Sequence, residues 1–213
     1  MDVPAGQFDI DLGKLPVVQH ASVFHVGTLQ MGNRERLSYE GDGLSVSIHP
    51  QDWRIIARLT GSTWELRHPN LESMSFLDVH SLSCDQRDTV LGWGLSQGWV
   101  EKVLQWQIPD FDENDNIVGS FCFDSFEEAA GELEMAERDN CVPVPVENFV
   151  ATADLPVERM EGNSALEGLL AVYVQHLTEL DGLWWSDSYD PQRYSCPRGV
   201  LLRGVGELSC SSV

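Results

Sequence analysis

The alternation of apolar and polar residues predicts short β-strands through the first third of the chain. Residues 21–26 (Ala-Ser-Val-Phe-His-Val) and 44–48 (Leu-Ser-Val-Ser-Ile) each predict a strand, the second behind a turn at residues 40–43. Two further strands are predicted at residues 63–67 and 76–80. Between these pairs, residues 49–59 carry a proline near the first turn and place Trp53, Ile56 and Ala57 on one face, which predicts a helix.

The remainder of the chain mixes longer helices with strands. Helices are predicted at residues 85–98 and 164–180, and Ser125 is expected to cap a third helix that runs to Arg138, with Glu128 at the capping-box position. The β-rich runs 99–108 and 117–123 are joined by a polar segment and predict a hairpin. Residues 141–146 are expected to be extended because two prolines exclude a helix and favour a sheet edge. The last predicted strands cover 182–185 and 199–202.

This order of elements has no regular βαβα alternation, so it predicts an α+β fold with mixed or antiparallel split sheets and flanking helices. A length of 213 residues suits one large domain. No internal repeat or linker divides the chain. We therefore expect a loose N-terminal lead-in over residues 1–20 and a single α+β domain over residues 21–213.

The charge narrows the range of partners. The chain carries 13 Lys and Arg against 34 Asp and Glu, a net charge of −21. A net negative charge of this size repels the phosphate backbone of nucleic acids, so direct nucleic-acid binding is not expected. A hydrophobic content of 42% excludes wholesale disorder. No run approaches the length of a membrane span and the first residues lack the pattern of a secretion signal, which together predict a cytoplasmic protein without a membrane partner.

Metal and disulfide sites are not indicated by the sequence. The five cysteines are widely spaced, odd in number and without a Cys-x-x-Cys pair, so neither a disulfide framework nor a zinc site is predicted. The acidic run 110–116 looks like half an EF-hand loop, but the glycine and the final glutamate of that loop are missing. A hairpin turn is the better interpretation of this run.

Two neighbouring segments carry the most unusual pattern in the chain. His-Val-Gly-Thr at residues 25–28 ends a predicted strand, and residues 41–50 read Gly-Asp-Gly-Leu-Ser-Val-Ser-Ile-His-Pro. This pattern resembles the ADP-ribosyltransferase superfamily, in which a strand ending in His-Gly-Thr is followed by Gly-x-Gly-Leu-Tyr-Val-Ser-x-(Asp/His)-Pro and a helix, all lining a nicotinamide pocket. Here Val26 separates the histidine from the glycine, and Ser45 stands where a tyrosine is common.

The resemblance implies NAD as the substrate and assigns roles to residues of both segments. His25 would bond a ribose hydroxyl as a catalytic residue, and the ring of Tyr39 or Trp53 would stack on nicotinamide. The implied NAD-binding set comprises Gly27, Thr28, Tyr39, Gly43, Ser45, Ser47 and Trp53. From the residues alone, the alternative is that His25 is a strand-end histidine whose hydrogen bonds are made within the fold, and that residues 41–43 simply form a tight turn.

These roles require strands 23–26 and 44–48 to be neighbours, because only adjacency brings His25 and Ser45 to one pocket. We expect His25 at a strand end, outside the core.

Transferases of this superfamily also need a late carboxylate that stabilises the cation developing on ribose. Asp187 follows the predicted strand 182–185 by two positions and is the leading candidate; Asp181 and Glu179 are alternatives, and Glu207 lies near the terminus. None of them stands in the Glu-x-Glu pattern familiar in the superfamily, and each is alternatively a solvated surface carboxylate. Arg198 is a candidate for holding a pyrophosphate or, alternatively, part of a surface ion pair.

Three functions remain open from the sequence. The first is an enzyme that transfers ADP-ribose from NAD to a macromolecule or hydrolyses NAD. The second is a noncatalytic acidic protein of a toxin-antitoxin, immunity or phage-conflict system that occupies a basic partner surface, which the net charge favours through electrostatic steering. The third is a transferase fold retained for binding alone.

Overall fold

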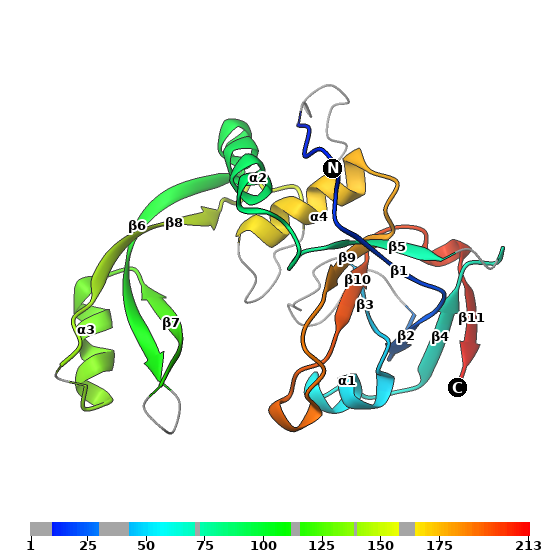
Figure 1. The fold of residues 1–213 in the computed structure, drawn as a ribbon, viewed down its shortest axis with the longest axis horizontal. Coiled ribbons are helices and arrows are strands. Elements are labelled where there is room, and N and C mark those ends of the chain that lie inside the picture. Colours follow the sequence, from blue (N-terminus) through cyan, green and yellow to red (C-terminus); the bar gives the residue numbers. More distant parts are fainter. Residues whose placement is uncertain (1–9, 30–42, 71–72, 112–115, 139, 158–164) are drawn as a thin grey trace.

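The computed structural model describes residues 10–29, 43–70, 73–111, 116–138, 140–157 and 165–213. Most of them form a body around a sheet of eight strands in the order β1-β5-β9-β10-β3-β2-β4-β11 (Figure 1). Its strands are β1 (Val17–His20), β2 (Val23–Val26), β3 (Leu44–Ser47), β4 (Thr63–Arg67), β5 (Met74–Asp78), β9 (Gly182–Trp185), β10 (Arg198–Leu201) and β11 (Ser209–Ser212). Only the β5–β9 pair is parallel; the other pairs in this sheet are antiparallel.

The second sheet forms an arm that extends from the body (Figure 1). It has the strand order β7-β6-β8, with β6 (Val100–Phe111) in the centre, β7 (Ile117–Phe123) on one edge and β8 (Val144–Ala151) on the other. Helix α3 (Phe126–Met135) packs on one face and buries Ala129 and Leu133 against Ile108 of β6. The Ser125 hydroxyl accepts a hydrogen bond from the Glu128 amide and caps this helix as predicted.

Three more helices belong to the body. They are α1 (Pro50–Ile56), α2 (Cys84–Gln97) and α4 (Ala165–Leu177). Ser83 and Gln86 form a capping box at the start of α2, and Gly98 ends the helix in the left-handed conformation. Because eight of the 13 residues of α4 are buried, this helix lies between α2 and the sheet and supplies much of the core.

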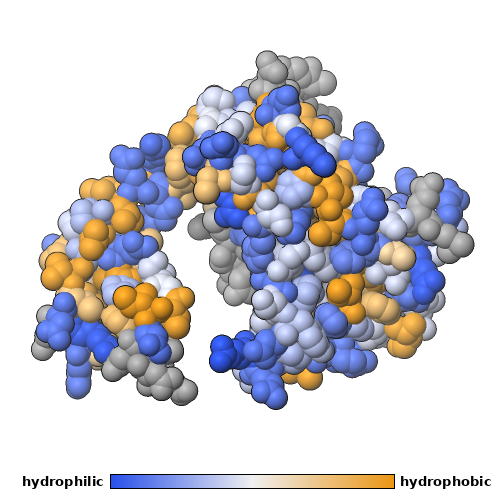
Figure 2. Space-filling model, in the orientation of Figure 1, coloured by the Kyte–Doolittle hydropathy of each residue, from blue (hydrophilic) through white to orange (hydrophobic). Residues whose placement is uncertain are grey.

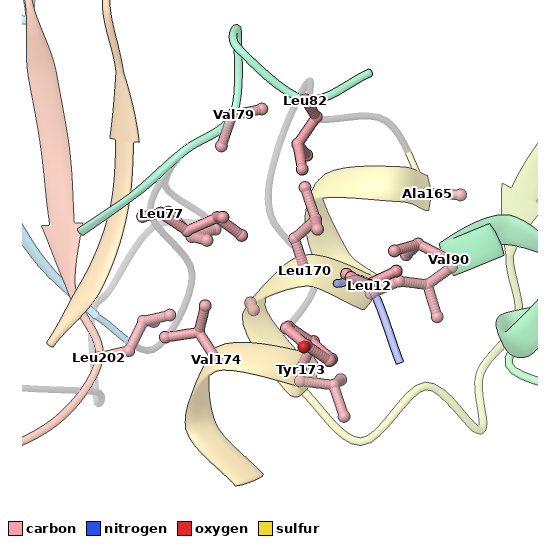
Figure 3. Close-up of a cluster of buried hydrophobic side chains, with 14 of the residues drawn as sticks. Leu12, Leu77, Val79, Leu82, Val90, Ala165, Leu170, Tyr173, Val174 and Leu202 are labelled. Atoms are coloured by element: carbon pink, nitrogen blue, oxygen red, sulfur yellow. The ribbon is translucent and has the colours of Figure 1, made fainter. Parts of the chain in front are cut away.

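The body contains two apolar clusters, one on each face of the large sheet. The first joins α2 and α4 to the sheet through residues such as Leu77, Leu170 and Val174 (Figure 3). The buried residues of the second all lie in strands, among them Phe76, Val46 and Leu66, and Val18 of β1 and Leu208 just before β11 pack at its margin. The sheet therefore curls on itself, and its second core is covered by its own strands and not by an α-helix among the described residues.

The α+β prediction, with a mixed sheet, an antiparallel sheet and flanking helices, is confirmed, as are the predicted hairpin and helices. The prediction of a loose lead-in over residues 1–20 is wrong for residues 10–20, the part of it that the structure describes. Strand β1 pairs with β5, and Leu12 is buried in the first cluster. The apolar contacts of Leu12 fix the N-terminal segment to the core. The sequence did not predict this because the apolar residues of the segment are too few to show a periodic pattern. Within the described residues, no helix is long and apolar enough to cross a membrane.

Two glycines of α2 provide a matched test of the α2–α4 packing. A Cβ on Gly94 would lie 2.5 Å from Leu169 Cδ1, and Leu169 is fully buried, whereas a Cβ on Gly92 would meet nothing within 4 Å. We expect Gly94→Ala to lower the free energy of unfolding by about 1–3 kcal/mol through overpacking. Gly92→Ala should raise it by about 0.5–1 kcal/mol through helix propensity. Chemical denaturation measures both, and equal effects of the two substitutions would contradict the close packing.

Candidate functional site

The ends of several strands meet at one edge of the large sheet. Asp78 pairs with Trp184 in the parallel β5–β9 ladder, so the chain leaves both strands at the same edge. The Val79 amide continues the ladder by donating to the Trp184 carbonyl at 2.9 Å. As a result, His80 and Asp187, which are far apart in sequence, lie side by side, with 3.7 Å between His80 Nδ1 and an Asp187 oxygen.

Buried Asp78 fixes the two segments that leave these strands. Its carboxylate accepts hydrogen bonds from the hydroxyls of Ser81 (2.7 Å) and Ser186 (2.9 Å) and from the His80 amide (3.2 Å). Asp78 is only 5% exposed, and a buried carboxylate is tolerated when it is hydrogen-bonded in this way. Asp78 therefore sets the positions of His80 and Asp187.

Arg198 completes a cluster at this edge because β10 begins where β9 ends. Its guanidinium donates to the Asp187 carboxylate and lies near two indole rings, 5.2 Å from the Trp185 ring centre and 5.9 Å from that of Trp53. The two side chains of the ion pair are about one quarter exposed, 28% for Arg198 and 22% for Asp187. We call His80, Asp187, Arg198, Trp53 and Trp185 the Arg198 cluster.

A chain of hydrogen bonds connects this cluster to β2. Trp53 Nε1 donates to the Ser45 hydroxyl at 3.0 Å, and His25 Nδ1 lies 2.8 Å from the Ser45 carbonyl oxygen. Strand β2 lies next to β3, with Phe24 opposite Ser47, so the predicted adjacency of these strands is confirmed. Both segments of the family-like pattern thus converge on Ser45.

His25 does not lie outside the core as expected. It is 6% exposed, and its second ring nitrogen, Nε2, lies 3.0 Å from the Thr28 carbonyl oxygen. Both ring nitrogens of His25 thus lie within hydrogen-bond distance of backbone carbonyl oxygens. The side chain holds the turn after β2 against β3, because this turn folds back over the ring.

The glycines of the pattern are used for close packing. Gly27 has φ +129°, and its amide and carbonyl are bonded to the Ser62 carbonyl (2.9 Å) and to Trp64 Nε1 (2.8 Å). A Cβ on Gly43 would lie 2.0 Å from Val200 of β10. Tyr39, the alternative stacking residue, lies outside the described residues. Of the two candidate rings, only Trp53 is therefore placed, and it is 6% exposed.

Ser47 and Cys196 lie beside Arg198. The Ser47 hydroxyl donates to the Pro197 carbonyl at 2.6 Å, accepts from the His49 amide at 3.0 Å and lies 3.9 Å from Cys196 Sγ. Burial raises the pKa of the Cys196 thiol, so this cysteine is a poor nucleophile at neutral pH.

Aromatic rings border the cluster on the outside. The ring of His49 stacks on that of Tyr189 with 4.1 Å between the ring centres, and the Tyr189 hydroxyl donates to Asp52 at 2.8 Å. This hydrogen bond to a carboxylate raises the pKa of Tyr189. Tyr189 is 52% exposed and offers a flat surface to a ligand.

The other predicted acids lie elsewhere. Asp181 accepts from the Ser75 amide at 2.7 Å and lies 3.4 Å from His68, so it connects β5 to β9. The Glu179 side chain is fully exposed, and Glu207 lies in a short 3-10 turn before β11. Of these carboxylates, Asp187 alone belongs to the Arg198 cluster.

Sequence reasoning missed His80 and Asp78. The signal that was available is their place at the end of a predicted strand, residues 76–80, but the parallel neighbour of that strand was not evident from the sequence. Among the described residues, no group of three or more His, Cys, Asp or Glu is arranged to hold a metal ion.

The burial of His25 generates a stability prediction. His25→Ala should lower the free energy of unfolding by about 2–3 kcal/mol, because it leaves buried carbonyls without donors. His80→Ala is the matched control, since the His80 side chain is 46% exposed, and it should change stability little. Urea denaturation compares them; an unchanged midpoint in His25→Ala would contradict the structural role.

Comparison of the chain with family models, with curated proteins and with solved structures gives no significant match. The site is therefore assigned from its own geometry.

Proposed function

We propose that the chain binds NAD at the Arg198 cluster and acts as an ADP-ribosyltransferase-like enzyme that transfers ADP-ribose to a macromolecule or hydrolyses NAD. The observation that carries this proposal is the convergence of the two family-like segments on Ser45, one hydrogen bond from Trp53, which itself contacts Arg198. The late acid Asp187 is bonded to the same arginine.

Arg198 is the residue suited to the pyrophosphate of NAD. A guanidinium presents a planar set of donors that matches phosphate oxygens. The guanidinium also lies near the rings of Trp53 and Trp185, which limits its conformational freedom and so reduces the entropy lost on binding. A pyrophosphate bound here would compete with Asp187 for the guanidinium.

Asp187 would then act on the ribose. Cleavage of the bond between nicotinamide and ribose passes through an oxocarbenium-like transition state, and a carboxylate beside it stabilises the positive charge. Asp187 is held by Arg198 on one oxygen and lies near His80 through the other. NAD binding would release it from one of these partners, at the moment when its charge is required.

His25 has a different role in this proposal from the one that the resemblance implies. Because it is buried and bonded to two carbonyl oxygens, we assign it as a positioning residue for Ser45 and the turn at residues 26–28. The stacked pair His49–Tyr189 is the aromatic group available to the base or the nicotinamide, because the Tyr189 ring is 52% exposed whereas Trp53 is buried.

The second candidate is the noncatalytic acidic binding protein. The observation that favours it is that Arg198 is already neutralised by Asp187 in a chain of net charge −21. In that case the cluster stabilises the sheet edge, and NAD does not bind.

Nicotinamide release from NAD tests the enzyme proposal. Asp187→Asn keeps the size of the side chain but removes its charge, so turnover should fall by about 10² or more with little loss of NAD affinity. Arg198→Gln should instead weaken NAD binding. Chromatography of the released nicotinamide and calorimetric titration with NAD measure the two effects.

Glu179→Gln serves as the control, because the Glu179 side chain is fully exposed and outside the cluster. Equal turnover of wild type and Asp187→Asn would remove the role given to Asp187. If the wild-type protein neither binds NAD nor releases nicotinamide with any acceptor, the enzyme proposal fails and the binding function takes its place.

A further inference from the structure

Strand β7 is an unusual sheet edge. Among the described strands it pairs only with β6, and its sequence, Ile-Val-Gly-Ser-Phe-Cys-Phe, contains no charge and no proline. Soluble proteins normally protect an edge strand with charged residues or proline, because the unpaired backbone groups of the edge attract another strand. A bulge disturbs the register only at the start of β7, and five regular pairs follow, from Gly119 opposite Asp110 to Phe123 opposite Trp106.

The same edge borders an apolar hollow. A cavity of about 410 Å³ lies between the β6–β7 hairpin and α3, with apolar walls from Ile108, Phe121, Phe123 and Leu133. Phe121 is 52% exposed, and Ile117 and Val118 on the same strand are more than 60% exposed. Figure 2 shows apolar residues among hydrophilic ones over the end of the arm. The hollow has the size to take one apolar side chain of a partner.

The segment that carries this apolar surface is strongly acidic. Residues 100–151 contain thirteen Asp and Glu against one Lys and one Arg, a net charge of −11 and more than half of the charge of the whole chain. Asp110, Glu132 and Arg138 lie in the wall of the hollow, two carboxylates against one guanidinium. The two cations are engaged within the arm, Lys102 with Glu147 and Phe149, and Arg138 over the Phe111 ring at 4.5 Å.

We propose that the β7 edge is a docking site for an extended, cationic segment of another protein. The segment adds to β7 as a fourth strand, places an apolar side chain in the hollow beside Phe121, and sets its Lys or Arg residues against the acids around it. Backbone pairing supplies affinity in this mode of recognition, and alternate side chains supply specificity. This surface lies on the arm, away from the Arg198 cluster, and the proposal does not depend on NAD chemistry.

The charge selects this occupant over others. A second copy of the chain would bring two arms of net charge −11 together, and like charges placed face to face oppose association. Nucleic acids and anionic membranes are repelled for the same reason. The negative electrostatic potential of the arm attracts a basic segment throughout its approach.

A peptide titration tests the proposal. The probe is a fluorescein-labelled nonapeptide in which Lys alternates with Val, with leucine at the central apolar position, and fluorescence anisotropy follows its binding in reducing buffer because Cys122 of the edge is exposed. We expect saturable binding that weakens with added salt. A peptide with Glu in place of Lys should not bind. The same Lys peptide with N-methylated backbone amides should bind about tenfold more weakly, because strand pairing needs the amide donors.

Two variants locate the contact. Phe121→Ser should weaken binding about tenfold, as expected for a side chain that lines the central hollow. Met135→Ser, which changes a residue that is 74% exposed on α3 but outside this hollow, should leave binding unchanged. Thermal midpoints confirm that both variants are folded. Hydrogen exchange should slow at residues 119–123 when the peptide is bound.

Four results would overturn the proposal. The first is the absence of saturable binding by the Lys peptide. The second is equal binding of the N-methylated peptide. The third is equal affinity of Phe121→Ser and Met135→Ser for the Lys peptide. The fourth is a dimer in sedimentation experiments that Phe121→Ser dissociates, which would assign the edge to a second copy of the chain.

Discussion

The parallel pairing of β5 with β9 is the constraint on which the site depends. In a sheet whose other pairs are antiparallel, this one pair sends two distant segments out at the same edge. Buried Asp78 then binds the hydroxyls of Ser81 and Ser186, one from each segment, and holds the segments together. The positions of His80, Asp187 and, through β10, Arg198 all follow from this local arrangement.

The surroundings of residue 198 explain why an arginine suits this position better than a lysine. The guanidinium is flat and lies near two indole rings while it donates to the Asp187 carboxylate. An ammonium group has no plane to stack and is more strongly hydrated. The pair is therefore oriented before any ligand arrives, and a ligand that displaces Asp187 meets a donor set already in place.

Local periodicity was sufficient to predict most elements, because short alternating runs and capped helices carry their signal in neighbouring residues. The β2–β3 adjacency was predicted from the roles that the family resemblance gives to His25 and Ser45. It could not predict partners across the sheet. Residues 76–80 were recognised as a strand, but nothing in them specifies a parallel neighbour more than 100 residues away. For His25 the sequence showed a strand end, whereas the turn at residues 26–28 folds back over the ring and buries it.

The arm also has a consequence for local stability. Among the described residues of the arm, its own apolar cluster contains only three buried ones, Ile108, Ala129 and Leu133, while Val100 at the start of β6 belongs to the core of the body. A region with so few buried contacts opens with a lower free energy than the whole molecule. The end of the arm therefore forms a separate cooperative unit that can unfold while the body remains intact. Any molecule that binds only its folded form shifts that local equilibrium by mass action, and so protects the arm from proteolysis without altering the global stability of the body.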